Sequence, residues 1–358
     1  MPRLLRARLQ PVAHPAAVPA MHRTDGGGAP VKVSSLLGPA GGVLGSRFLL
    51  VSYLPTLSCG FFLLVLAWAG APRAGAPDFG RAWDTIAQLG VGELLLLWLA
   101  LTLVAIVAHP FQLRLVRVLE GDWPAILARI RVRAVRRQES RRQEAERRTA
   151  SLSPSAAEMN RAGAAWTELT TRFPPNELPA APTALGNTLA AMESYAGSTH
   201  RLDVVVAWPR LYPLVDGGAK ESVDTYRDAM DAASRLAVTA SLTAVAAAAL
   251  LWHSGWWLLL AAAPAFLARL SYRAAVHSAA AYGAAVDAAI DTYRFALYDK
   301  LCLARPATPG AERDLNALLC THWRQRVPLP ADLPYTHSPA ASEPTPESAS
   351  RTDPAQNA

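Results

Sequence analysis

The sequence predicts an all-α membrane protein with four transmembrane helices, arranged as two hairpins, and a helical cytoplasmic domain. Three observations lead to this fold class. Residues 48–72, 94–113 and 236–268 contain no Asp, Glu, Lys or Arg. Many arginines follow the second run, and basic residues flank the third run on both sides. Apolar runs near this length span a bilayer core as helices, and adjoining basic residues mark the cytoplasmic side.

The composition of the whole chain agrees with the membrane class. Of its 358 residues, 51% are hydrophobic, and the formal net charge is +7. Residues 114–148 hold eleven arginines against five acidic residues, a charge of +6, directly after the second apolar run. Positive charge beside a span favours contact with anionic lipid headgroups. No nucleic-acid-binding module accompanies this charge, so nucleic acid is not an expected partner.

The N-terminal part divides into a tail and the first hairpin. Residues 1–46 are rich in Ala, Pro, Gly and Arg without a sustained period, and we expect them to be disordered. Translation starts at either Met1 or Met21 on this reading. Residues 47–113 are the predicted transmembrane hairpin 1, whose weakly acidic loop at residues 72–93 faces outward.

A cytoplasmic helical insert is predicted for residues 114–235, with a basic helix at residues 122–148 that Asp122 would cap. Nine arginines between Arg129 and Arg148 face three glutamates there, while the predicted apolar side carries Trp123, Ile126, Leu127, Ile130 and Ala134. Such a helix either binds an anionic membrane surface or is a solvated stem, and both readings stay open. The candidate lipid-facing residues are Arg136, Arg137, Arg141 and Arg142.

Two further helices are expected in the insert. One begins at Ser153-Pro154 and ends before Phe173, and the other begins after the Thr183 cap and stops near Gly197. The sequence WPRLYP follows them, and its two prolines predict an extended backbone.

The candidate interaction residues are Trp208, Arg210 and Tyr212, which alternate in WPRLYP. In an extended backbone they would point to one side, and Arg210 would stack between the two rings. The segment is then either a docking surface or a buried strap on the helical bundle. The strap is favoured, because aromatic side chains usually belong to a core.

Transmembrane hairpin 2 is predicted for residues 236–268, with a tight turn at Trp252–Trp257. One straight helix of that length would be about 50 Å long, which exceeds a bilayer core. Basic residues at both ends place both ends in the cytoplasm.

The last ordered part is a cytoplasmic helical region at residues 269–327, followed by a disordered tail at residues 328–358. Its first helix carries an apolar stripe that we expect to pack on the basic helix or on the helix at residues 155–170. Asp291 and Arg294 would pair across one turn, and a last helix spans about Gly310 to Trp323. The stripe consists of Val286, Ile290, Tyr293, Leu297 and Leu301.

No signature of catalysis is present. The sequence lacks H-E-x-x-H, G-x-S-x-G, a Walker motif and a dinucleotide fingerprint, and its three cysteines have no paired spacing. We therefore expect no catalytic, cofactor-binding or metal-binding residues and no cofactor. His200 stands near Asp203, and a surface pair is favoured over a catalytic dyad, because no nucleophile motif accompanies it.

Three segments together resemble a known family. They are VRVLEGDW after the second span, WPRLYPLV in the insert and YGAAVDAAIDTYRFALY after the third apolar run. These segments resemble a family of uncharacterised integral membrane proteins of high-GC Gram-positive (actinobacterial) bacteria, over about residues 45–325. That family would carry an aromatic residue where Asp122 stands. The resemblance implies the architecture and a bacterial plasma membrane, and no activity.

The function expected from these features is that of a structural, scaffold or sensory membrane protein with a basic cytoplasmic domain. It would be a multi-pass plasma-membrane protein with both termini in the cytoplasm, and its partners would be the lipid bilayer and anionic headgroups. An oligomeric passive channel is the alternative, since an Ala-rich face in the third run would allow a homo-oligomer. A membrane-bound enzyme ranks lower.

Overall fold

The computed structural model describes residues 54–71, 75–150 and 156–336. This part of the chain is helical and has no β-strand, and an isolated bridge joins Leu303 to Tyr335. The predicted all-α class is therefore confirmed. The predicted disordered segment at residues 1–46 lies outside the described residues, as does the tail from residue 337.

Apolar helices suited to a membrane are present. Helix α9 (Gly217–Leu250) and the stretch Gly255–Lys300, which contains helix α10 (Ala262–Lys300), are each long and apolar enough to cross a bilayer. Helix α3 (Phe79–Gln88) and residues Val91–Val107 of helix α4 (Val91–Glu120) form a third candidate, bent by 112°. Helix α2 (Leu54–Trp68) is apolar and shorter.

The predicted outward loop contains a helix, α3, that the sequence reading did not foresee. Asp78 caps it, since its side chain accepts a hydrogen bond from the Arg81 backbone N–H at 3.2 Å. Ala82 is buried whereas Trp83 is exposed, so the helix has two different faces. Residues 79–88 of this connection thus form an amphipathic helix.

The α2–α4 connection and the α9–α10 connection lie together. Phe79 of α3 is 5.4 Å from Trp257 between ring centroids, and Trp257 stacks on Trp256 at 4.2 Å. Leu66 of α2 and Leu251 after α9 belong to one buried apolar cluster. As predicted, α9 is followed by a turn at residues 251–254, and the 3-10 helix η7 (Gly255–Ala261) then leads into α10.

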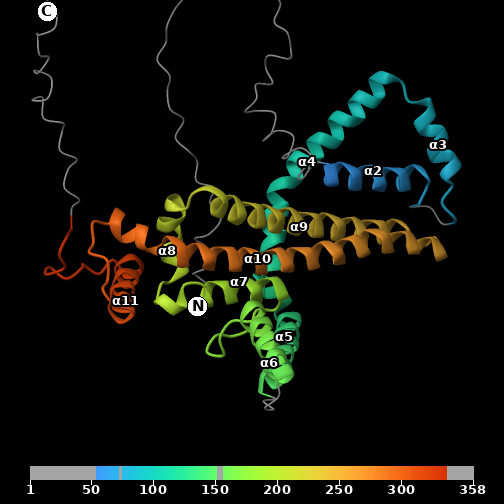
Figure 1. The fold of residues 1–358 in the computed structure, drawn as a ribbon. Coiled ribbons are helices and arrows are strands. Elements are labelled where there is room, and N and C mark those ends of the chain that lie inside the picture. Colours follow the sequence, from blue (N-terminus) through green and yellow to red (C-terminus); the bar gives the residue numbers. More distant parts are fainter. Residues whose placement is uncertain (1–53, 72–74, 151–155, 337–358) are drawn as a thin grey trace, which may run out of the picture. The chain divides into compact units, whose positions relative to one another are not determined.

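Helices α9 and α10 lie side by side (Figure 1). Both helices bury small residues, and small side chains let two helix backbones approach closely. The buried alanines on them are Ala237, Ala240 and Ala247 on α9, and Ala268, Ala275, Ala279 and Ala289 on α10.

Large apolar side chains are exposed on the same segments that the sequence marks as membrane-spanning. A water-soluble protein does not expose apolar surface on this scale, whereas a bilayer requires it. On α4 they are Leu94, Leu95, Leu96, Trp98, Leu99, Leu103, Val104, Ile106 and Val107. On α9, η7 and α10 they include Leu242, Val245, Trp256, Leu259, Phe266 and Leu270.

Within the predicted insert, Gly121 ends α4 in the left-handed conformation, with φ 107°. The predicted cap at Asp122 is wrong, because Pro124 precedes the 3-10 helix η4 (Ala125–Leu127), and helix α5 (Ala128–Ala150) follows. The indole of Trp123 instead donates to the Val118 carbonyl at 2.9 Å. A proline fixes φ before the first turn, which lets the helix begin after it.

The next two helices follow those of their sequence signals that lie within the described residues, and the predicted start at Ser153-Pro154 lies outside them. Helix α6 (Ala156–Arg172) ends before Phe173, and helix α7 (Ala184–Tyr195) begins after Thr183, whose hydroxyl accepts from the Gly186 N–H at 3.1 Å. Helices α5 and α6 lie side by side (Figure 1).

The main apolar core joins the insert to α10. Val286, Ile290 and Leu297 of α10 pack with buried residues of the segment 196–215 and with Val223 of α9. The predicted seam against the basic helix or against residues 155–170 is therefore wrong. Helix α10 packs mainly on α9, on α7 and on the segment that follows α7, and only weakly on α6.

The C-terminal region is anchored on α10. Thr308 caps helix α11 (Pro309–Gln325), and Tyr298, Leu303 and Leu319 form a small core with Leu329 and Leu333 packed against it. The Thr336 N–H donates to the Cys302 carbonyl at 2.7 Å. The prediction that the disordered tail starts at residue 328 is wrong for residues 328–336, because two leucines among the prolines find an apolar surface.

Candidate functional site

Helix α5 has one packed face and one free face. Gln138 is buried on the packed face, beside α6. On the opposite side Arg129, Arg133, Arg136 and Arg137 recur at helical spacings and are all exposed. We name these four residues the α5 arginine face.

The charge of this face is not compensated within the described part of the chain. None of its four guanidinium groups has an ion-pair or hydrogen-bond partner among the described residues. Two of the three nearby glutamates serve other arginines, since Glu144 pairs with Arg148 at 3.4 Å and Glu146 with Arg142 at 3.8 Å. An unpaired row of arginines is a surface suited to anions.

Arg142 does not belong to this face, although the sequence reading placed it there. Its side chain is only 14% exposed, and its Nη1 donates to the Leu178 carbonyl at 3.3 Å. Arg142 therefore holds the loop after α6, so its prediction as a lipid-facing residue is wrong. Arg141 is exposed, as are Arg136 and Arg137.

Two residues of the predicted apolar side of the basic helix are exposed rather than buried. Ile126 is 90% exposed, and Ile130 is exposed one turn later. Both share a side of the helix with Arg133 and Arg137, at spacings of three, four and seven residues. The free face thus combines bulky apolar side chains at its start with arginines along its length.

The candidate segment WPRLYP is helical, so the predicted extended backbone is wrong. Helix α8 (Val204–Leu211) contains Pro209, and the 3-10 helix η6 (Tyr212–Leu214) contains Pro213. Asp203 caps α8 by accepting from the Val205 N–H at 2.9 Å. Val204, Ala207 and Leu211 are buried at helical spacing, and their burial decides the conformation.

Trp208 and Tyr212 come together in this helix, and Arg210 does not lie between them. The two rings are 5.6 Å apart and pack, partly buried, against the main core. Arg210 stands over the Trp323 ring of α11 at 4.7 Å, and its Nη1 donates to the Val206 carbonyl at 2.6 Å. Burial and a hydrogen bond to Asp224 raise the pKa of Tyr212 to about 12. These contacts are those of a strap on the bundle.

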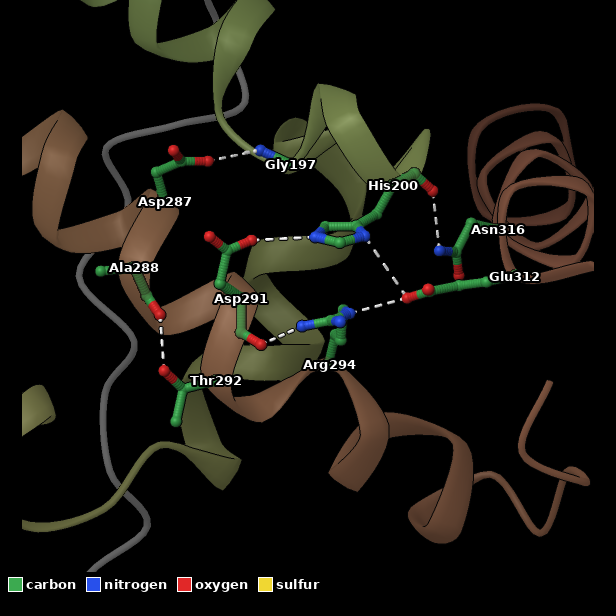
Figure 2. A network of polar contacts seen from close by, with 9 residues as sticks. All are labelled: Gly197, His200, Asp287, Ala288, Asp291, Thr292, Arg294, Glu312 and Asn316. Carbon is green, nitrogen blue, oxygen red and sulfur yellow. Dashed lines mark hydrogen bonds and ion pairs between the residues drawn. The ribbon is translucent and has the colours of Figure 1, made fainter. Parts of the chain in front are cut away.

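A polar network that the sequence reading missed lies where the α7–α8 connection meets α10 and α11 (Figure 2). His200, in the 3-10 helix η5 (Ser198–His200), has Nε2 at 2.9 Å from Asp291 Oδ1 and Nδ1 at 3.5 Å from Glu312 Oε1. Arg294 Nε is 2.7 Å from the same Glu312 oxygen. We name these four residues the His200 network.

Two sequence-based pairings are replaced by this network. Asp203 was expected beside His200, but it caps α8 and pairs with Arg324 of α11. Asp291 and Arg294 were expected to pair, but Arg294 binds Glu312 and donates only to the Asp291 backbone carbonyl. In each case a partner distant in sequence displaces the local one.

The sequence of α11 carries a detectable signal of this buried polar contact. Glu312, Asn316, Leu319 and Cys320 are spaced as the buried face of a helix, so two polar residues on that face indicate a buried contact. Asn316 Nδ2 donates to the His200 carbonyl at 2.8 Å, and Tyr298 donates to Asn316 Oδ1 at 2.6 Å. The spacing does not predict that the η5 segment with His200 is the partner of these polar residues.

The chemistry available to the His200 network is charge pairing. No group of three or more metal-ligating side chains occurs among the described residues. Cys320, which lies near the network on α11, accepts a hydrogen bond from the Asp203 N–H at 3.3 Å, and burial raises its pKa to about 11. A thiol with that pKa is a poor nucleophile.

Comparison of the chain with known protein families, with curated proteins and with solved structures found no match.

Proposed function

We propose that this chain is a multi-pass plasma-membrane protein with a structural, scaffold or sensory role. Four transmembrane segments in two hairpins hold both termini in the cytoplasm, and the α5 arginine face rests on the anionic leaflet. The single observation that carries this proposal is the row of exposed, unpaired arginines on a helix that directly follows an apolar segment.

The exposed apolar side chains of α4, α9 and α10 support the membrane location. Helix α2 and the apolar part of α4 would form the first hairpin, with α3 in the connection between them, and the apolar ends of α9 and α10 would form the second. The resemblance of three segments to integral membrane proteins of high-GC Gram-positive bacteria supports the plasma membrane.

The contact between Phe79 and Trp257 supports a position on the same side of the membrane for the α2–α4 connection and the α9–α10 connection. The arginines after α4 and the basic residues beside α9 and α10 favour the cytoplasm for the opposite side. Together they support an outward position for both connections.

Lipid binding by the α5 arginine face is tested on the full chain in vesicles. A fluorophore on Ser140→Cys, which lies on the exposed side of α5, reports shielding from a soluble quencher. We expect greater shielding in phosphatidylcholine vesicles that contain phosphatidylglycerol than in pure phosphatidylcholine, and we expect added salt to reduce the difference. Each arginine near an anionic leaflet contributes about 1 kcal/mol.

A matched pair of variants makes the test specific. Arg136→Gln/Arg137→Gln should abolish most of the lipid-dependent shielding. Arg313→Gln/Arg326→Gln makes the same charge change on and directly after α11, at two exposed positions, and should leave the shielding unchanged. Equal shielding in neutral and anionic vesicles at low salt would contradict the proposal.

A further inference from the structure

Helix α3 has three different sides. Ala82 is 2% exposed and faces the protein, and α3 packs against α2. On a second side Phe79 and Trp83 stand one turn apart, and Trp83 is 70% exposed. The third side is exposed and polar, so α3 presents bare aromatic surface along one side and polar groups along another. The polar residues are Arg81, Asp84 and Gln88.

The aromatic side of α3 continues into the connection between α9 and α10. The Phe79 ring is 5.4 Å from the Trp257 ring, and Trp256 stacks on Trp257 at 4.2 Å. Trp256 is 69% exposed, so this second connection also turns a large aromatic side chain away from the protein. We name Phe79, Trp83, Trp256 and Trp257 the aromatic surface.

The bend between α3 and α4 relates this surface to a bilayer. Helix α3 and residues Val91–Val107 are bent by 112°, which is close to a right angle. Leu89 and Gly90 at the corner are extended, and the Glu93 carboxylate accepts a hydrogen bond from the Gly90 N–H at 3.1 Å. Where α4 crosses a bilayer near the normal, α3 therefore runs along the membrane surface.

The side chains of α3 determine the depth that suits it. Its ten residues make a helix about 15 Å long, half the thickness of a bilayer core, so it does not cross. Arg81 and Asp84 are costly in hydrocarbon. Trp83 in water would extend the bare apolar patch that begins on α4 at Val91. The boundary between headgroups and acyl chains satisfies both sides of the helix.

We propose that α3 is an interfacial helix of the outer leaflet and that the aromatic surface binds phospholipid at the boundary between headgroups and acyl chains. An indole ring suits this boundary, because its body is apolar and its N–H donates to a polar group. Both connections between spans are thereby held in the same leaflet. The proposal rests on the membrane location proposed above for α4.

The charge of this region distinguishes its lipid from that of the α5 arginine face. Asp78, Arg81 and Asp84 are the charged residues of the range 75–90, and they sum to −1. Such a segment gains nothing from anionic headgroups, so its binding comes from burial of aromatic surface. Zwitterionic phosphatidylcholine is therefore a sufficient partner.

The test measures depth in phosphatidylcholine vesicles, with the full chain freed of its natural cysteines. A nitroxide label is attached to Trp83→Cys or to Gln88→Cys, which lie on the aromatic and the polar side of α3 and are both exposed. Paramagnetic resonance gives the accessibility of each label to oxygen, which collects in the bilayer, and to a nickel chelate, which stays in water. We expect the ratio of oxygen to nickel accessibility to be about fivefold higher at position 83 than at position 88. Phosphatidylglycerol and added salt should not change this ratio.

Two further labels make the result specific. Trp256→Cys, on the second connection, should behave like position 83. Leu99→Cys lies in the apolar part of α4, where Leu99 is 58% exposed, and should be accessible to oxygen and not to nickel. This label reports the membrane location of α4 independently of α3.

The outcomes separate the two proposals. Nickel accessibility at position 83 equal to that at position 88, with oxygen accessibility kept at position 99, overturns the interfacial helix and leaves the membrane location standing. Nickel accessibility at position 99 overturns both. A label at position 83 that is shielded from both reagents and broadened by a second label means that another copy of the chain covers the aromatic surface, which also overturns lipid as its partner.

Discussion

Trp208 is partly buried and packs against both Tyr212 and the main core. We expect Trp208→Ala to lower the free energy of unfolding by about 3 kcal/mol, because a cavity remains in a packed region. Thermal unfolding of the purified protein in detergent measures this change. Arg210→Ala, which removes an exposed contact with Trp323, should cost less, about 0.5–1 kcal/mol.

A different pattern would assign the segment another role. If Trp208→Ala melts normally and the protein loses a homo-oligomer, the two aromatic residues form a docking surface rather than a strap. Size-exclusion chromatography with light scattering on the same samples distinguishes these outcomes.

The prolines of this segment explain why its conformation was not predictable from the sequence. Pro209 within α8 lacks the N–H that would bond to the Val205 carbonyl, which is unfavourable in an isolated helix. Burial of Ala207 and Leu211 outweighs that cost. Local rules describe the proline correctly, but only the core around it decides between strand and helix.

Among the elements, α4 and α7 cross at a single glycine. A methyl group added to Gly186 would lie 2.0 Å from the Glu120 carbonyl oxygen, which belongs to the backbone and cannot yield without moving α4. We expect Gly186→Ala to destabilise the protein by about 1–3 kcal/mol. Thermal unfolding in detergent measures the difference.

Gly163 supplies the control for this change. It is an exposed helical glycine on α6 with nothing within 4 Å of an added methyl group. Gly163→Ala should therefore be neutral or stabilise the protein by up to about 1 kcal/mol, since alanine favours helix. Equal melting temperatures for the two variants would mean that α4 and α7 do not cross closely.

Elements marked by charge and caps were predictable, whereas those set by distant partners were not. The Thr183 cap and the turn after α9 follow from residue types that act within one helical turn. Helix α3 had a signal in Asp78 and was still missed, because a short polar stretch between two spans was taken for a loop. The His200 network needed α11 to fold back on α10, and no local pattern encodes that contact.

For the whole molecule, the contact between Phe79 and Trp257 ties the positions of the two connections together. In a variant without its natural cysteines, single cysteines at the exposed positions Ala87 and His253 should both react with an impermeant reagent in intact cells. Cysteines at Ser140 and Gln325 should react only after the cells are opened. The reason is that, in the proposed topology, the arginines beside the spans hold those parts in the cytoplasm.

A mixed result would be decisive. Reaction at position 87 and protection at position 253 would place the two connections on opposite faces, which is incompatible with rings that are 5.4 Å apart. Reaction at position 325 from outside, with position 140 protected, would mean that the chain crosses the membrane an odd number of times between these two positions.

The shared core has a consequence for how the protein is made. Its residues come from the segment 196–215, from Val223 and from the α10 residues Val286 and Ile290. The ribosome synthesises the apolar turn between α9 and α10 after the segment 196–215 and before Val286 and Ile290. Segments that emerge first must therefore wait, with Leu202 and Leu211 still uncovered, until the final apolar stretch has entered the bilayer. In the proposed topology, the cytoplasmic part would therefore assemble last, after that stretch has been inserted.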